Sequence, residues 1–502
     1  MSHRFSVVCS ALVFVLFLGV AGIGAGEPPV KVQVKWDRVT RELKTRPNIL
    51  FGAAPMEARN APLHDAFFQR VKELAADNVR YATGGPYPFY GVVERQAPTA
   101  TETFWDFSTI DPVTEDMFKA AGGRPLVVNF TNIPEWMFKR AVPIVYPTDP
   151  NEKFWKYTEP GELRDPSGKE AADYFARIVS WYVKGGFKDE LGKWHESGHH
   201  YKIDYWEVLN EPDRERQFNV ETYTRIYDAT VEAIRKVSPQ TKFVGVSHSY
   251  PGGVPQFFLY FLNPKNHKPG IPLDMISYHF YAVPNPDEPP SAHQYTFFNQ
   301  ADRFLEIVGY IETLRKMLSP RTGTMVNEIG TMLPGDWDQD KPGYVAKPIR
   351  PEYWNLSAAV FAYVYAGLAR QGIDDASMSG MPTEPGMWPS IGMLDVDTAQ
   401  PNARYHVLKL IRQNFRPGDK MVETSTDGGY VTAQAFVSPS GEHKLLLVNH
   451  REREFEINLE TTGAKVEVVD LTTGGNPPAV STLPGSSFKL GGFGVAAVTL
   501  AK

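Results

Sequence analysis

The feature that most restricts the fold is a regular alternation of short β-like runs and amphipathic helical stretches between residues 48 and 415. Strands separated by helices can pair in parallel, with the helices covering the sheet. No Gly-x-Gly-x-x-Gly segment opens a helical stretch, which disfavours an open sheet that binds a dinucleotide. The alternation predicts an α/β fold, a (β/α)8 TIM barrel over residues 48–415, with strands at 49–51, 78–81, 125–130, 205–209, 242–246, 274–278, 324–326 and 374–378.

Beyond residue 416 the pattern changes. Runs such as 429–437 and 444–448 alternate apolar and polar residues with a period of two, between glycine and proline turns. This period is that of strands with one buried face. Residues 416–502 are therefore predicted to form an accessory antiparallel β-sandwich. The N-terminal segment 27–47 contains the same alternation and could return as an extra strand of that sandwich.

The first 26 residues have the pattern of an export signal. Arg4 precedes an uncharged apolar run that extends to Gly24, and small residues follow near Ala25. A retained membrane anchor would have a similar run. A cleaved signal peptide over residues 1–26 is the prediction, so the mature chain is expected to be secreted, periplasmic or extracellular, without stable membrane association.

Composition disfavours several other classes of function. The net charge is −6, the isoelectric point is about 6.1 and no basic run is present, so nucleic acid is not expected as a partner. The only cysteine is Cys9, inside the predicted signal peptide. A mature chain without it has no thiol for disulfides, thiolate catalysis or zinc ligation.

Two glutamates stand where predicted barrel strands end. Glu211, in Asn210-Glu211-Pro212, follows the fourth run, and Glu328 follows the seventh. Barrel enzymes place catalytic groups at the carboxyl ends of their strands. Two carboxyl groups at that end, one protonated and one ionised, can break a glycosidic bond. The alternative is that both are ordinary surface-loop glutamates.

Trp206-Glu-Val-Leu-Asn-Glu-Pro212, Ser277-Tyr-His-Phe-Tyr281 and Glu328 together resemble clan A glycoside hydrolases, most closely family 39. That family includes retaining β-xylosidases and α-L-iduronidases, built as a barrel with an accessory β-domain. The resemblance implies that Glu211 is the general acid/base and Glu328 the nucleophile. It also implies that Asn210 bonds the sugar 2-hydroxyl and that Tyr281 holds the nucleophile. It implies a carbohydrate substrate and neither a metal nor an organic cofactor.

Further residues are expected to contact the substrate or support the site. Arg80 would bond the nucleophile's carboxylate, although a structural ion pair is the alternative, and His279 is either a pocket residue or a satisfied core histidine. Flat sugar faces pack on aromatic rings, which favours tryptophans after the strands. The remaining candidates are Trp388, Trp136, Glu384 and Asn129.

The sequence also departs from the family pattern. Leu209 precedes Asn210, where family 39 β-xylosidases usually have tryptophan, and the segment after Arg80 lacks the usual His-Gly. Both departures fall around the sugar pocket, so the identity of the sugar stays open, as does the oligomeric state. The long loop 142–167 decides between an exo-acting pocket, the favoured β-xylosidase-like form, and an endo-acting cleft.

Two hypotheses of other classes remain. One is a barrel that binds glycan without cleaving it, although both carboxylates are present. The other is a zinc metalloprotease, because His195-Glu196-Ser-Gly-His199 matches the letters of H-E-x-x-H. That chemistry needs a helix to align both histidines. The glycines around the motif and the strand-like residues 201–204 predict a polar turn there instead.

Overall fold

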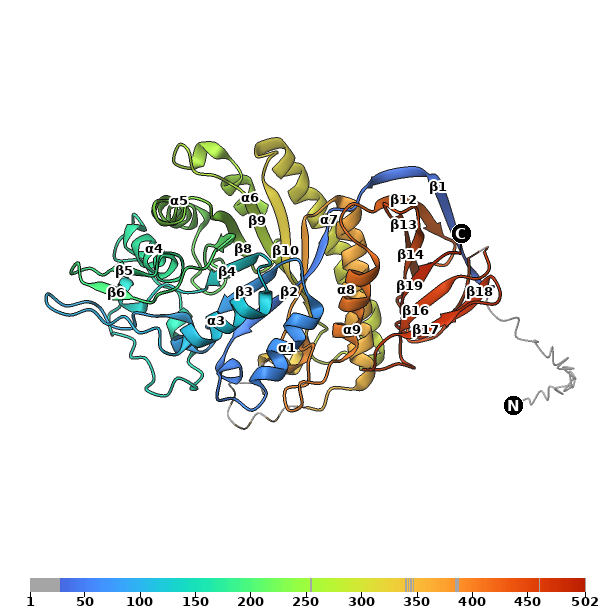
Figure 1. Cartoon of the computed structure of the whole chain (residues 1–502), viewed down its shortest axis with the longest axis horizontal. Helices are drawn as coiled ribbons and strands as arrows, with labels where there is room; N and C mark the ends of the chain where they lie inside the picture. The colour runs from blue at the N-terminus through green and yellow to red at the C-terminus, as the bar shows by residue number, and fades with distance from the viewer. Residues whose placement is uncertain are drawn as a thin grey trace, which may run out of the picture.

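The computed structural model describes residues 28–501 except 253–254, 339–340, 342, 344, 346, 384–387 and 460. The predicted signal peptide and Cys9 lie outside the described residues. Figure 1 shows a barrel ringed by helices, with a β-sheet domain packed at one side. The predicted (β/α)8 barrel with a C-terminal β-domain is therefore confirmed.

Eight parallel strands close the barrel. They run in the order β10-β11-β2-β3-β4-β7-β8-β9, so sequential strands are neighbours around the ring. The bounds are β2 Arg46–Ala53, β3 Val79–Thr83, β4 Leu126–Phe130, β7 Tyr205–Glu207, β8 Lys242–His248, β9 Met275–Ala282, β10 Gly323–Thr331 and β11 Asp375–Met378. Because the strands are parallel, all their carboxyl ends open on the same face of the barrel.

The surrounding helices bury one apolar face each against the strands. In α5, Asn219 caps the first turn by accepting the Thr222 N–H at 2.9 Å, and Tyr223, Ile226 and Tyr227 are fully or almost fully buried. The helices are α1 His64–Leu74, α2 Pro88–Gly91, α3 Ile110–Ala121, α4 Lys169–Lys184, α5 Val220–Val237, α6 Pro255–Phe261, α7 His293–Leu318, α8 Pro351–Gln371 and α9 Ala403–Asn414. None of the helices within the described residues is both long and apolar enough to span a membrane.

The second domain is a nine-stranded mixed sheet in the order β17-β16-β19-β14-β13-β12-β1-β15-β18. The N-terminal strand β1 lies inside it, antiparallel to β12 and parallel to β15. Valines, leucines and phenylalanines from both ends of the sheet share one apolar core, so the sheet folds over on itself. The bounds are β1 Val30–Glu42, β12 Lys420–Thr426, β13 Val431–Val437, β14 His443–Asn449, β15 Phe455–Asn458, β16 Lys465–Val469, β17 Ala479–Thr482, β18 Ser487–Leu490 and β19 Val495–Thr499.

Helices α8 and α9 lie between the barrel and this sheet (Figure 1). Arg370 at the end of α8 donates to Gln434 Oε1 at 2.9 Å and to the Ala433 carbonyl at 2.8 Å, both on β13. On the other side of that contact, Phe298 of α7 stacks on His450 with ring centroids 4.3 Å apart. These contacts fix the sheet domain on the flank of the barrel.

Candidate active site

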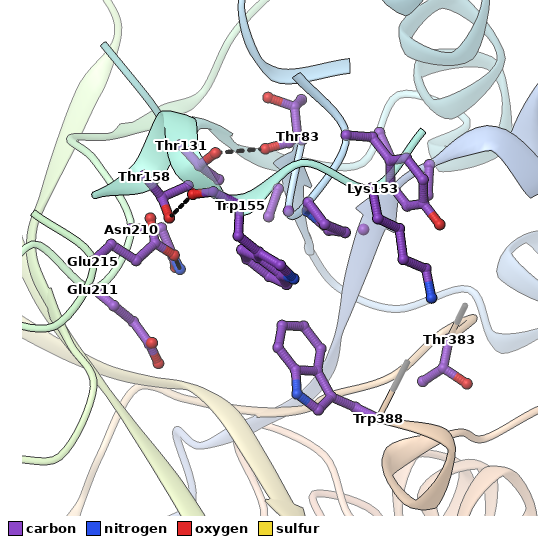
Figure 2. A pocket seen from close by; sticks show the side chains of 18 of the residues that line it. Thr83, Thr131, Lys153, Trp155, Thr158, Asn210, Glu211, Glu215, Thr383 and Trp388 are labelled. Atoms are coloured by element: carbon purple, nitrogen blue, oxygen red, sulfur yellow. Dashed lines mark hydrogen bonds between the residues drawn. The ribbon is translucent and has the colours of Figure 1, made fainter. Parts of the chain in front are cut away.

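A cavity of about 830 Å³ opens at the carboxyl ends of the barrel strands. Both Glu211 and Glu328 line it. Figure 2 shows Asn210, Glu211 and Glu215 along one wall, and Trp155 and Trp388 facing each other nearby. Glu211 is 7% exposed and Glu328 8% exposed, so each is reachable from the cavity while largely shielded from bulk water.

Glu328 lies inside strand β10 rather than after it, because β10 continues to Thr331. The strand register breaks between Val326 and Glu328 in the pairing with β9. Neighbouring residues of a regular strand face opposite sides, whereas a bulge allows both to turn the same way. Here Asn327 and Glu328 both reach partners in the barrel interior, Glu207 and Arg80.

The carboxylate of Glu328 is held by three neighbours. Arg80 Nη1 donates to Oε1 at 2.6 Å, the Tyr281 hydroxyl donates to Oε2 at 2.6 Å, and His279 Nδ1 lies 3.5 Å from Oε2. Burial by itself raises the pKa of Glu328, but His279, Arg80 and Tyr281 outweigh it, so the pKa lies below its ordinary value of 4.5. Glu328 is therefore ionised at neutral pH, as an attacking carboxylate must be.

Glu211 sits on a strained turn after β7. Its φ of 39° and the φ of 64° at Leu209 are left-handed values that side-chain-bearing residues rarely adopt. The turn brings Glu211 Oε1 to 2.8 Å from His279 Nδ1, and Arg214 Nη1 lies 3.3 Å from Oε2. One carboxylate oxygen each of Glu211 and Glu328 lie within 4.8 Å of each other. The two predicted carboxylates thus converge on one point.

His279 connects the two carboxylates from below the cavity. It is fully buried, with Nε2 at 3.2 Å from the Ser247 hydroxyl. Burial lowers the pKa of His279, but Glu328 and Glu211 more than compensate, so the pKa lies above 6.5. These three groups could also hold a metal ion by distance alone. Arg80 already neutralises Glu328, which disfavours a second cation there.

Arg80 connects three hydrogen-bond acceptors beneath the cavity. It is fully buried and donates to Glu207 Oε2, Glu328 Oε1 and Asn210 Oδ1, each at 2.6 Å. Glu207 is also fully buried and accepts from Ser277, Asn129 and Asn327. Glu207 is therefore an interior partner beneath the cavity, and its bonds fix Arg80.

Asn129 was predicted to contact the substrate, and the structure places it elsewhere. Its side-chain amide donates to Glu207 Oε2 and to the Leu209 carbonyl, both at 2.8 Å, and the residue is fully buried. It therefore belongs to the interior network beneath the cavity and not to its wall. Arg80 and His279 are likewise buried under the site, and they hold the two carboxylates rather than line the cavity.

The predicted aromatic residues have different places. Trp388 lines the cavity, with its ring centroid 5.6 Å from that of Trp155. Trp136 instead lines a separate groove, under the guanidinium of Arg164, and donates its indole N–H to the Glu94 carbonyl at 2.8 Å. The prediction for Trp136 at the main cavity is not met. Glu384 lies outside the described residues.

One wall of the cavity comes from the strap, which we define as residues 142–167. Its short helix η3, Trp155–Thr158, and the residues on either side line the cavity. The strap is tied down by the Tyr157 hydroxyl, which donates to the Gly85 carbonyl at 2.5 Å, and by the Phe154 N–H, which donates to the Pro86 carbonyl at 2.8 Å. Gly84 makes room for this docking, since a Cβ there would lie 2.9 Å from the Tyr157 hydroxyl.

The H-E-x-x-H letters do not form a protease zinc site. His195 lies in strand β6, Trp194–Glu196, and His199 in the irregular segment after it. His195 Nε2 lies 2.8 Å from Asp189 Oδ2, while His199 Nε2 lies 2.8 Å from Asp111 Oδ2. The two imidazoles are thus bound to different carboxylates, as expected of a polar turn and not of a metalloprotease helix.

Sequence reasoning did not single out two residues that line the cavity, Trp155 and Glu215. Trp155 lies in a loop without hydrophobic periodicity, so the sequence does not predict which way its side chain points. Glu215 follows Glu211 by four residues, and its N–H donates to the Glu211 carbonyl at 2.8 Å in a single helical turn. That spacing places both side chains on one face and was a signal available in the sequence.

A family model described as Glycosyl hydrolases family 39 matches residues 162–322. The matched range contains Glu211, His279 and Tyr281 and ends before β10, which carries Glu328. A search among proteins of curated function found no match.

Solved structures share the fold across almost the whole chain. A GH51 arabinofuranosidase from Xanthomonas axonopodis pv. citri is 12% identical, with a TM-score of 0.64 over 94% of this chain and 100% of its own. An α-L-arabinofuranosidase from Thermotoga maritima is 13% identical, with a TM-score of 0.61 over 94% and 99%. A GH30 endoxylanase from Clostridium papyrosolvens is 13% identical, with a TM-score of 0.57 over 95% and 100%.

At these identities the neighbours establish the fold alone. The family match adds the class of reaction, and the site supplies two converging carboxyl groups at the carboxyl ends of barrel strands. Together these observations identify the chain as a glycoside hydrolase, similar over residues 162–322 to glycosyl hydrolases family 39.

Proposed function

We propose that this protein is a secreted, retaining, exo-acting glycosidase of the β-xylosidase-like kind, with Glu328 as nucleophile and Glu211 as general acid/base. The observation that carries the proposal is the pair of carboxylate oxygens within 4.8 Å of each other beside the cavity. The secretion rests on the apolar leader at residues 1–26. Sequencing the N-terminus of the exported chain checks it, and an intact leader would refute it.

In the first step, a Glu328 oxygen bonds to the anomeric carbon as the glycosidic C–O bond breaks, and the Glu211 proton moves to the leaving oxygen. In the second step, water bonds to the anomeric carbon and gives its proton to Glu211, and the Glu328 carboxylate leaves. Arg80 and Tyr281 hold Glu328 in its ionised form. Their donors also fix the direction from which it attacks.

Retention of the anomeric configuration is the expected stereochemical result. Retaining enzymes place their two carboxyl groups about 5–5.5 Å apart, and inverting enzymes about 6.5–9.5 Å apart to admit a water. The oxygens of Glu211 and Glu328 within 4.8 Å favour the first arrangement. Proton NMR of the first sugar released from an aryl glycoside, recorded before mutarotation, measures the result. A product of inverted configuration would refute the two-step mechanism.

The strap favours exo action over endo action. An endo-acting enzyme needs a cleft open at both ends, whereas the strap residues from Lys153 to Pro160 form one wall of the cavity. The Trp155 and Trp388 rings face each other near this wall (Figure 2). A chain end could enter such a pocket, and its terminal sugar could pack on these rings.

Replacing Trp155 with alanine is expected to raise KM for a short oligosaccharide about tenfold, because the lost stacking contributes roughly 0.5–1.5 kcal/mol beyond the buried area. Trp194→Ala, on the distant β6 hairpin and 51% exposed, is the matched control and should leave KM unchanged. Chromatography of early products from a long xylan or xylo-oligosaccharide should show monosaccharide first. Early release of mixed longer fragments would establish the endo-acting alternative instead.

A further inference from the structure

A third carboxyl group, Glu215, belongs to the cavity but has no place in the two-glutamate mechanism. It lines the cavity beside Asn210 and Glu211 (Figure 2). Glu215 Oε1 accepts a hydrogen bond from Asn210 Nδ2 at 3.0 Å. Glu215 Oε2 is buried and has no hydrogen-bond partner within the part of the chain that the structure describes.

We propose that Glu215 is a positioning residue of this site, which fixes the side-chain amide of Asn210 by accepting from its Nδ2 and does so as an uncharged carboxylic acid. The proposal rests on the proposed function for its activity readout, because Asn210 is the residue expected to bond the sugar 2-hydroxyl. Glu215 does not touch the reacting atoms and acts through Asn210.

The orientation of Asn210 follows from its two neighbours. Arg80 can only donate, so the atom that faces its Nη2 at 2.6 Å must be the amide oxygen. The Ser247 hydroxyl donates to the same oxygen at 3.4 Å. The amide nitrogen is left to face Glu215 Oε1, which accepts one of its two N–H groups. Without Glu215 the Asn210 amide is held only through its oxygen, and its amide nitrogen loses its fixed orientation.

The uncharged state follows from the surroundings of Glu215. An ionised carboxylate with one oxygen buried and unpartnered would be costly, whereas the protonated group is tolerated. Two ionised carboxylates would also repel each other, because Glu211 and Glu215 belong to the same turn. Burial and then Glu211 raise the pKa of Glu215 to about 8, and the facing groups Asn210, Arg216 and Arg214 lower it less. Tyr157 of the strap also lies within electrostatic reach. At pH 7 the carboxyl group of Glu215 therefore keeps its proton.

The test compares Glu215→Ala, Glu215→Gln, Asn210→Ala and the double variant N210A/E215A on an aryl glycoside. E215A should lower kcat/KM about tenfold or more, the size expected when a hydrogen-bond partner of a site amide is removed. E215Q offers the same acceptor without charge and should stay within about threefold of wild type. In the N210A background, E215A should have almost no further effect, because both act through one contact. Equal losses in E215Q and E215A, or losses that multiply in the double variant, would overturn the proposal.

A second measurement needs no substrate and separates this proposal from the proposed function. Infrared spectra of wild type minus E215Q at pH 7 should show the carbonyl band of a protonated carboxylic acid, which disappears as pH rises through about 8. A difference spectrum that shows only a carboxylate would refute the uncharged state. Glu221→Gln, on the exposed first turn of α5, is the matched control and should give no such band. Failure of the wild-type chain to cleave any aryl glycoside would refute the proposed function and leave this spectrum as the decisive test of Glu215.

Discussion

Replacing Glu328 with alanine is expected to lower kcat/KM on an aryl glycoside by at least about 10⁴-fold, the scale on which loss of a covalent nucleophile acts. The variant keeps Glu211 and the cavity but has no group that can bond to the anomeric carbon. Steady-state hydrolysis of a substrate with a good leaving group measures the loss. Glu196→Ala on the exposed β6 hairpin is the control and should retain wild-type rates.

Added azide should restore activity to the Glu328 and Glu211 alanine variants with opposite stereochemistry. In E328A, azide occupies the space of the missing carboxylate and attacks from its side, so a glycosyl azide of inverted configuration forms. In E211A, Glu328 still forms the covalent intermediate, and azide replaces the water of the second step, so the configuration is retained. Proton NMR of each glycosyl azide distinguishes the two. Retention in E328A, or inversion in E211A, would contradict the assigned roles.

The barrel could be predicted from sequence because its signal is repeated. Most of the β-like runs are rich in apolar residues and the helical stretches between them carry an apolar stripe, so an error in one segment does not change the alternation. The amphipathic stretches at 169–184, 220–237 and 351–371 of the sequence coincide with helices α4, α5 and α8. The strand ends were less accurate. β9 and β10 continue past their predicted ends because polar residues such as His279 and Glu328 remain in the strand, where buried partners satisfy them.

The site was predicted where strand ends and residue chemistry coincide. Glu211, Glu328, Asn210, Tyr281 and Trp388 all line the cavity. The roles of Asn129 and Trp136 could not be resolved from sequence, because a polar or aromatic residue near a strand end can face the interior, the cavity or another groove. Which direction it takes depends on bulges and turns such as the one between Val326 and Glu328. Trp155 belongs to the strap, which is held in place by hydrogen bonds to Gly85 and Pro86. These residues are far from the strap in sequence, so no local pattern predicts the contact.

Replacing Arg80 with methionine is expected to destabilise the fold by about 3–5 kcal/mol, because it leaves buried carboxylates without their cation. Arg80 bonds both Glu207 and Glu328 at 2.6 Å, and its side chain is 1% exposed. Denaturant unfolding measures the loss. Arg38→Met is the matched control. It breaks the surface pair of Arg38 and Glu423, whose side chains are 62% and 43% exposed, and should leave the free energy of unfolding almost unchanged.

The pH dependence of this loss tests its cause. Because the pKa of Glu328 in the folded state lies below 4.5, its ionised form contributes stability above that pH, and this contribution is lost as pH falls through the folded-state value. Arg80 supplies part of that shift, so the stability gap between wild type and R80M should narrow as pH falls below about 4.5. The acidic limb of kcat/KM should also move to higher pH in R80M, since Glu328 takes up its proton sooner. Arg80→Lys should recover only part of either effect, because a single ammonium cannot donate in three directions to Glu207, Glu328 and Asn210. A gap independent of pH would mean that Arg80 stabilises the barrel by packing alone.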